Sequence, residues 1–153
     1  MHPTLAEILA RTRTELKERR PNLRRLEAAA FAQPVPPSLR GALGGPMVGL
    51  IAEVKRRSPS RGVIAEELDP VALARACVEG GASALSVLTD GPFFGGSLAD
   101  LEAVTAQVRV PVLRKDFILD EVQILEARAA GASAVLLMAR ALDSSRLRGL
   151  HRF

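Results

Sequence analysis

The chain has 153 residues, which suits one domain, and 48% of them are hydrophobic, enough for a sizeable core. Its formal net charge is +4, but only 3% of its residues are aromatic, and this argues against nucleic-acid binding and favours an anionic small molecule. The single cysteine, Cys77, excludes an internal disulfide and is predicted to be a small buried hydrophobe. No stretch approaches the ~18 apolar residues of a membrane span, and no signal peptide is evident, so we expect a cytoplasmic protein without a membrane partner.

Helical spacing marks the first part of the chain. Apolar residues recur from position 5 to about position 20 behind a capping-box pattern, and Pro21 ends this helix. Shorter helices are predicted over 23–31 and 38–43, with a proline-rich connector between them. We interpret residues 1–46 as a helical extension that precedes the main fold.

From residue 48 onward, strands alternate with helices of about ten residues. The strands are expected at 48–55, 84–89, 110–115 and 134–138, and the helices at 69–79, 97–107, 120–130 and 143–153. Residues 79–88 and 129–138 are two copies of one helix end, turn and strand, which indicates an internal repeat. Such alternation requires parallel strands joined by right-handed crossovers.

Two α/β architectures fit this pattern, a doubly wound open sheet and a (β/α)8 TIM barrel. No strand is followed by the glycine-rich dinucleotide loop of the first. Charged residues instead stand at the ends of strands, where barrel enzymes carry their chemistry. We therefore expect a TIM-barrel type of which residues 47–153 supply only the first half, four parallel βα units that stop after the fourth strand and helix.

Glu53 and Lys55 are the first candidates for chemistry. Side chains alternate along a strand, so these two charges share one face of an otherwise apolar strand. They form either an ion pair that ends the strand or a site in which each charge tunes the pKa of the other. Lys115 and Asp116, after the third expected strand, are open to the same two interpretations, a solvated loop entry or a functional pair.

Two loops could assist these charges. The loop over 89–97 holds adjacent phenylalanines and three glycines, and its aromatic rings either pack beneath the loop or cover a planar ligand. The loop over 58–62 offers hydroxyls, backbone N–H groups and positive charge that could close over an anion, although it could also be a plain solvated loop. Metal-ligand spacing and an internal histidine are absent, so acid–base work falls to Lys and Glu.

Four motifs, in this order, resemble the successive signatures of the indole-3-glycerol phosphate synthase family. They are IAEVKRRSPSRG at 51–62, SVLTD at 86–90, FGGS at 94–97 and PVLRKDF at 111–117. The resemblance implies a cofactor-free carbon–carbon lyase of tryptophan biosynthesis. It would close the indole ring of a phosphorylated substrate, 1-(2-carboxyphenylamino)-1-deoxyribulose 5-phosphate, with loss of carbon dioxide and water.

The same resemblance implies roles for individual residues. Lys115 matches the general acid, Lys55 a lysine that contacts the substrate and assists proton transfer, and Glu53 the carboxylate that holds the lysines and stabilises positive charge. Substrate contacts are implied for Ser58 in the mobile first loop, for the aromatic residues Phe94 and Phe117, and for the apolar wall residue Leu136.

Members of the family continue through four further strands that are not part of this sequence. Alternatives to an active synthase therefore stay open. One is a truncated, catalytically inactive half-barrel that self-associates or only binds an anionic ligand. Another is completion of the barrel by another chain through exposed strand edges. A Schiff-base aldolase that uses Lys55 or Lys115 and nucleic-acid binding by the arginine-rich start are the remaining hypotheses.

Overall fold

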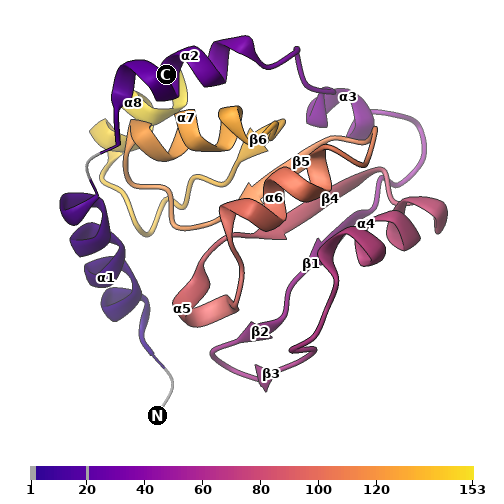
Figure 1. Cartoon of the computed structure of the whole chain (residues 1–153), viewed down its shortest axis with the longest axis horizontal. Helices are drawn as coiled ribbons and strands as arrows, with labels where there is room; N and C mark the ends of the chain where they lie inside the picture. Colours follow the sequence, from indigo (N-terminus) through magenta and orange to yellow (C-terminus); the bar gives the residue numbers. More distant parts are fainter. Residues whose placement is uncertain (1–2, 20) are drawn as a thin grey trace.

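The computed structural model describes residues 3–19 and 21–153 (Figure 1). The chain begins with three helices, α1 (Leu5–Glu18), α2 (Leu23–Ala32) and α3 (Leu39–Leu43). The predicted capping box of α1 is present, because Thr4 Oγ1 accepts from the Glu7 N–H at 3.3 Å and Glu7 Oε2 accepts from the Thr4 N–H at 2.6 Å. The predicted end of this helix near Arg20 lies outside the described residues, and α1 ends at Glu18.

A parallel four-stranded sheet follows, in the spatial order β1-β4-β5-β6. Its strands are β1 (Ile51–Val54), β4 (Ala84–Leu88), β5 (Val112–Lys115) and β6 (Ala134–Val135). The helices that alternate with them are α4 (Pro70–Glu79), α6 (Leu98–Thr105), α7 (Glu121–Ala129) and α8 (Ser144–Arg152). This arrangement confirms a partial (β/α) barrel of the TIM type. Within the described residues, no helix is long and apolar enough to cross a membrane.

The two outer strands are shorter than predicted. β1 begins at Ile51 instead of residue 48, since Val48 is 98% exposed and has no neighbouring strand to pair with. β6 pairs with β5 through only two residues and ends at Val135, three residues before the predicted end. Both corrections have the same cause. The predicted bounds followed the apolar runs, and these runs extend beyond the residues that pair with a neighbouring strand.

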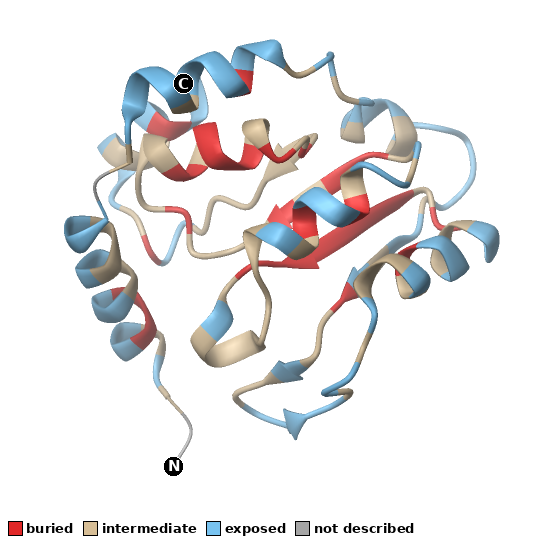
Figure 2. Cartoon of the chain, viewed as in Figure 1, coloured by how far each residue is buried: buried red, intermediate tan, exposed pale blue. Residues whose placement is uncertain are grey.

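The core lies between the sheet and its helices. All five residues of β4 are buried, because this strand is paired on both edges and covered by helices (Figure 2). Leu101 and Val104 of α6 are fully buried against it. Cys77 is only partly buried, at the margin of this core, whereas the sequence predicts a buried residue. The α2 helix packs on α7 on the outside of the barrel layer (Figure 1).

Two small elements lie where the sequence indicates only loops. A hairpin of β2 (Arg57–Ser58) and β3 (Gly62–Val63) follows β1, and the one-turn helix α5 (Gly91–Phe94) follows β4. In the view of Figure 1 they lie side by side below the sheet, and α5 contacts β2. Both elements therefore lie beyond the carboxyl ends of the strands, where a barrel places its functional loops.

Candidate active site

Glu53 lies between two lysines at the carboxyl end of the sheet. Its Oε1 accepts a hydrogen bond from Lys55 Nζ at 2.8 Å, and its Oε2 accepts one from Lys115 Nζ at 2.8 Å. Lys55 comes directly after β1, and Lys115 ends β5 on the other side of β4. Alternation along β1 places Glu53 and Lys55 on one face, as predicted, and the parallel sheet adds Lys115. We call these three residues the charged cluster.

The pKa of Glu53 is lowered. Burial on its own raises this pKa, but hydrogen bonds and positive charges from Lys115 and Lys55 outweigh that effect. Glu53 is therefore a carboxylate at neutral pH and can hold both ammonium groups. The side chains remain 30% exposed at Glu53, 31% at Lys55 and 36% at Lys115. The charged cluster is thus both an ion-paired strand end and a group of charges that a ligand can reach.

A pocket with a cavity volume of about 70 Å³ opens beside the charged cluster. It is lined by Glu53, Leu88, Asp90, Phe94, Lys115, Asp116, Phe117, Leu136 and Met138. The rings of Phe94 and Phe117 lie 6.2 Å apart between centroids at an interplanar angle of 45°. This tilted pair forms the aromatic wall of the pocket, and Glu53 and Lys115 belong to its charged lining. The pocket therefore offers an aromatic side to a flat apolar ring and a charged side made of Lys115 and the carboxylates of Glu53, Asp90 and Asp116.

The loop after β4 places Phe94 in this pocket. Asp90 begins α5, because its Oδ1 accepts hydrogen bonds from two N–H groups of that helix at 2.8 and 3.2 Å. Gly95 then turns the chain with a left-handed φ of 68°. Gly96 lies so close to the end of β4 that a Cβ there would be 2.0 Å from the Leu88 carbonyl oxygen. The two glycines of the FGGS motif are therefore required by geometry.

Asp90 and Asp116 also line a second, polar cavity of about 230 Å³ that α1 covers. The pKa of Asp90 is raised, mainly by burial and also by the negative charges of Asp116 and Glu15, although hydrogen bonds from α5 oppose the shift. The two aspartates thus form a shared wall between a pocket on the sheet and a cavity beneath the first helix.

Arg56 anchors the hairpin to the neighbouring elements. Its two terminal nitrogens bind Asp100 of α6 at 2.6 and 3.0 Å, and Nη1 also donates to the Gly95 carbonyl oxygen at 3.0 Å. The pKa of Arg56 is raised, chiefly by the hydrogen bond with Asp100. Arg57 donates to the carbonyl oxygen of Pro92 in α5. The base of the hairpin is therefore tied to the loop that carries Phe94.

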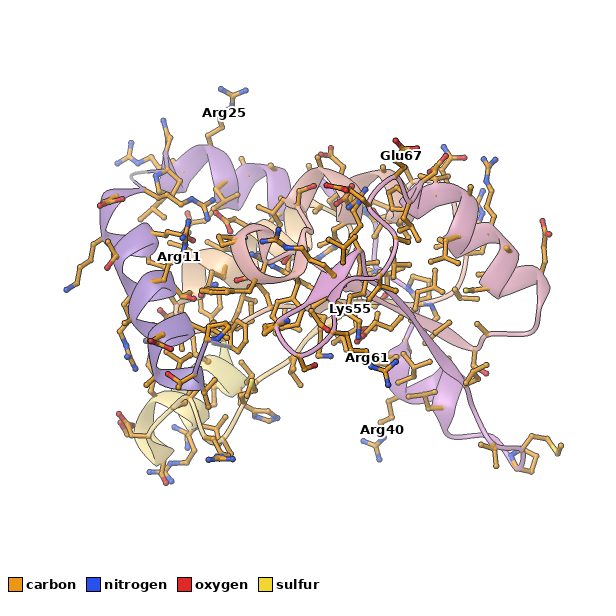
Figure 3. All side chains as sticks on the ribbon, turned by 90° about the horizontal axis from the view of Figure 1, so that it is seen from below. Arg11, Arg25, Arg40, Lys55, Arg61 and Glu67 are labelled. Carbon is orange, nitrogen blue, oxygen red and sulfur yellow. The ribbon has the colours of Figure 1, made fainter. Side chains whose placement is uncertain are left out.

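Ser58 lies in this hairpin and not among the residues that line the pocket. Its Oγ accepts a hydrogen bond from the Arg61 N–H at 3.3 Å within the turn. Figure 3 views the molecule from this side and labels Lys55 and, on the hairpin, Arg61. The two residues of β3, Gly62 and Val63, are exposed. Lys55 reaches the site through Glu53, whereas Ser58 stays outside the pocket in this structure.

The structure thus gathers most of the residues named from the sequence. The pocket lining includes the predicted residues Glu53, Phe94, Lys115, Phe117 and Leu136. It also includes Leu88, Asp90 and Met138, which the sequence analysis did not name as site residues, and Asp116, which it named only as the possible partner of Lys115. Asp116 and Met138 lie one and two positions from a named residue, so strand alternation could have identified them. Leu88 and Asp90 lie at and just after the end of β4, where the position of the strand end could have indicated them.

Comparisons with known proteins identify the family of this chain. The family model described as "Indole-3-glycerol phosphate synthase" matches residues 5–153. Relatives named indole-3-glycerol phosphate synthase include one from Parafrankia sp. (strain EAN1pec), 51% identical over 148 residues, which cover 95% of this chain and 55% of the relative. The relative from Leifsonia xyli subsp. xyli is 53% identical over 150 residues, with 96% and 58% coverage. That from Micrococcus luteus is 51% identical over 152 residues, with 95% and 57% coverage.

The chain therefore spans somewhat more than half the length of the curated relatives that it matches. The match to the family model extends over all four βα units and the helices before them. The four sequence motifs, the partial barrel and these matches agree with one another, and the chain belongs to the indole-3-glycerol phosphate synthase family.

Proposed function

We propose that this chain supplies the first part of the active site of an indole-3-glycerol phosphate synthase, a carbon–carbon lyase. The reaction is ring closure, decarboxylation and dehydration of 1-(2-carboxyphenylamino)-1-deoxyribulose 5-phosphate. The observation that carries the proposal is the charged cluster, in which Glu53 binds two lysines beside a pocket walled by Phe94 and Phe117. In this proposal residues 1–46 form a helical extension and residues 47–153 the catalytic part.

Lys115 is the proposed general acid. It would protonate the oxygen on the carbon that the aromatic ring attacks, so that this oxygen can later leave as water. A lysine ammonium has three protons, and Glu53 engages Lys115 at one oxygen only. A proton of Lys115 therefore remains for the substrate, and the 36% exposure of its side chain gives the substrate access.

Glu53 and Lys55 have supporting roles in this proposal. Lys55 would hold the anionic substrate electrostatically and assist proton transfer. Glu53 would hold the two lysines in register and stabilise the positive charge that develops on the aromatic ring as the bond forms. The lowered pKa of Glu53 supports this role, because the group is negatively charged at neutral pH.

Four further residues are proposed to contact the substrate. Phe94, Phe117 and Leu136 line the apolar side of the pocket and would hold the anthranilate ring. Ser58 is proposed to contact the substrate from the hairpin. Because Ser58 lies outside the pocket lining, this contact requires the hairpin to move toward the charged cluster.

We also propose that a partner covers the open edges of the sheet, either a second copy or another polypeptide. Among the described residues, β1 and β6 each pair with one neighbour only. Ile51 of β1 is a large apolar residue that is 40% exposed. A strand that pairs with such an edge would bond to its free backbone groups and cover Ile51. Analytical ultracentrifugation should then show a species heavier than the 16.3 kDa monomer, and a monomer at every concentration would contradict the pairing of copies.

Turnover is the direct test of the proposed reaction. The chain contains no Trp, so the fluorescence of an indole product can be followed without protein background. We expect turnover by the folded chain, loss of turnover in Lys115→Ala, and no loss in Lys17→Ala, which removes a lysine of α1 as a matched control. Turnover that survives Lys115→Ala contradicts the assignment of the acid. A folded chain without turnover contradicts the proposal that this chain catalyses the reaction without another polypeptide.

A further inference from the structure

Thr89 contacts three successive residues centred on Lys115. Its backbone N–H donates to the Lys115 carbonyl oxygen at 3.1 Å. Its Oγ1 accepts a hydrogen bond from Arg114 Nε at 3.0 Å and donates one to Asp116 Oδ2 at 2.5 Å. Arg114 Nη2 also donates to this same Asp116 oxygen, at 2.9 Å, which closes a ring of three side chains. One threonine therefore binds the backbone of the lysine and the side chains on either side of it.

This ring of side chains is buried. Arg114 is 3% exposed and Thr89 is 8% exposed. The remaining hydrogen bonds of the Arg114 guanidinium are also buried. Its Nη1 donates to the Gln123 carbonyl oxygen at 2.6 Å and to Glu126 Oε2 at 3.3 Å. Removing the threonine hydroxyl would leave Arg114 Nε and an Asp116 oxygen with one partner fewer where water does not replace it.

The ring also reaches the aromatic wall of the pocket. The second oxygen of Asp116, Oδ1, accepts a hydrogen bond from the Phe117 N–H at 2.8 Å. Asp116 therefore fixes the backbone of Phe117 with one oxygen while Thr89 and Arg114 hold the other. The side chains of Lys115 and Phe117 line the pocket, whereas Thr89 lines the second cavity behind it.

From these contacts we infer that Thr89 is a positioning residue for Lys115. Its hydroxyl locks the backbone over residues 114–117 so that Lys115 Nζ meets Glu53 and Phe117 faces Phe94. Thr89 does not line the pocket, so it acts only through the residues that it holds. The role in catalysis rests on the proposed function of Lys115, but the positioning itself is a property of the folded chain.

Lysine labelling measures this positioning without turnover. The chain has only three lysines, and Lys17 in α1 serves as an internal reference for Lys55 and Lys115. The probe is an acetylating succinimidyl ester at low dose, with the modified peptides quantified by mass spectrometry. Thr89→Val keeps the shape and the backbone N–H but removes the hydroxyl, and Thr89→Ser restores the hydroxyl. A Lys115 released from Glu53 is more accessible to the reagent.

We expect the ratio of Lys115 labelling to Lys17 labelling to rise about fivefold in Thr89→Val. This is the change in an equilibrium constant that corresponds to the net strength of one typical hydrogen bond. Thr89→Ser should restore the wild-type ratio. Asp116→Asn, which disturbs the other side of the ring, should raise the ratio as well and provides a second test if Thr89→Val does not fold. Where turnover is measurable, Thr89→Val should lower kcat through Lys115, and KM should change only as far as Phe117 moves, because Thr89 binds no substrate directly.

General loss of stability is the competing explanation. Asn22→Ala removes the N-cap of α2, whose side chain accepts from the Arg25 N–H, and it lies outside the ring of three side chains. The inference is overturned if folded Thr89→Val labels Lys115 like the wild type or no more than Asn22→Ala does. If the wild-type chain shows no turnover, only the proposed function is contradicted. The labelling experiment still tests the role of Thr89.

Discussion

The two lysines of the charged cluster come from regions of very different character. Lys115 belongs to the end of β5, where Arg114 and Thr89 are buried and hydrogen-bonded on all sides. Lys55 leads into the β2–β3 hairpin, whose second strand is exposed and which Arg56 anchors to the rest of the fold. The difference is visible in Figure 2, where β4 is buried throughout while the hairpin is largely exposed.

The loop after β5 is braced further by Gln123. Its side-chain nitrogen donates to the Phe117 carbonyl oxygen at 3.0 Å, and its oxygen accepts from the Leu119 and Asp120 N–H groups at 2.7 and 3.1 Å. Because local stability follows buried contacts, the β5 side of the pocket should hold its geometry while the β1 side opens and closes. The comparison indicates that Lys115, the proposed proton donor, is held in place and faces a more mobile Lys55.

Removing a buried arginine should have the largest effect. Arg114→Met leaves Glu126 and Asp116 as buried carboxylates with fewer partners, which typically costs about 3–5 kcal/mol. Arg56→Met, on the hairpin side, breaks a less buried pair with Asp100 and should cost about 1 kcal/mol. Urea unfolding of both variants measures the difference, and equal losses would remove the distinction between the two sides.

Gly96→Ala should have the next largest effect. The added methyl group would overlap the Leu88 carbonyl oxygen, and accommodating it should cost about 1–3 kcal/mol and shift the loop that carries Phe94. Gly149→Ala is the control, because a Cβ at that helical position in α8 meets no atom within 4 Å. It should leave the unfolding midpoint unchanged or raise it. A stable Gly96→Ala protein would show that this close approach is not restrictive.

Loosening the hairpin should produce a smaller and local effect. Asp100→Asn weakens the bidentate pair with Arg56, so the hairpin should open more often. Tryptic cleavage after Arg61 should then be about fivefold faster, the change expected for about 1 kcal/mol of local stability. Glu102→Gln, at an exposed position of the same helix, should leave the cleavage rate unchanged. Faster cleavage after Lys115 in Asp100→Asn would contradict the independence of the two sides.

Titration of Glu53 should have the smallest effect. Since its pKa is lower in the folded chain than in the unfolded chain, its stabilising contribution is present at neutral pH and is lost as the pH falls through the folded pKa. Glu53→Gln should therefore cost about 0.5 kcal/mol at pH 7 and progressively less in acid. Urea titrations from pH 7 to pH 3 measure this, and a difference that grows in acid would reverse the assigned direction.

Local patterns predicted much of the fold. The capping box of α1 depends on residues three positions apart, and the shared face of Glu53 and Lys55 depends on residues two positions apart. Both features were therefore accessible from spacing alone. Resemblance to a family added the candidate aromatic residues Phe94 and Phe117, which the structure places in one pocket.

Other features depend on contacts between distant residues. The ring around Thr89 joins it to Arg114, 25 positions away, and no periodic pattern marks such a contact. The hairpin after β1 requires a left-handed Gly62 and antiparallel pairing of two-residue strands, which are too short to leave an alternation. The ends of β1 and β6 likewise depend on whether a neighbouring strand is present to bond with.

The shared carboxylate of Glu53 has an electrostatic consequence for ligand capture. Two ammonium groups and one carboxylate leave a net charge of +1 in the charged cluster. This excess is partly exposed and acts on anions within about 8 Å at physiological ionic strength, while Asp90 and Asp116 of the same pocket offset part of it. The association rate of a phosphorylated or carboxylated ligand should therefore fall as salt is added. In the charge-reversal variant Lys55→Glu, the association rate should instead rise with salt.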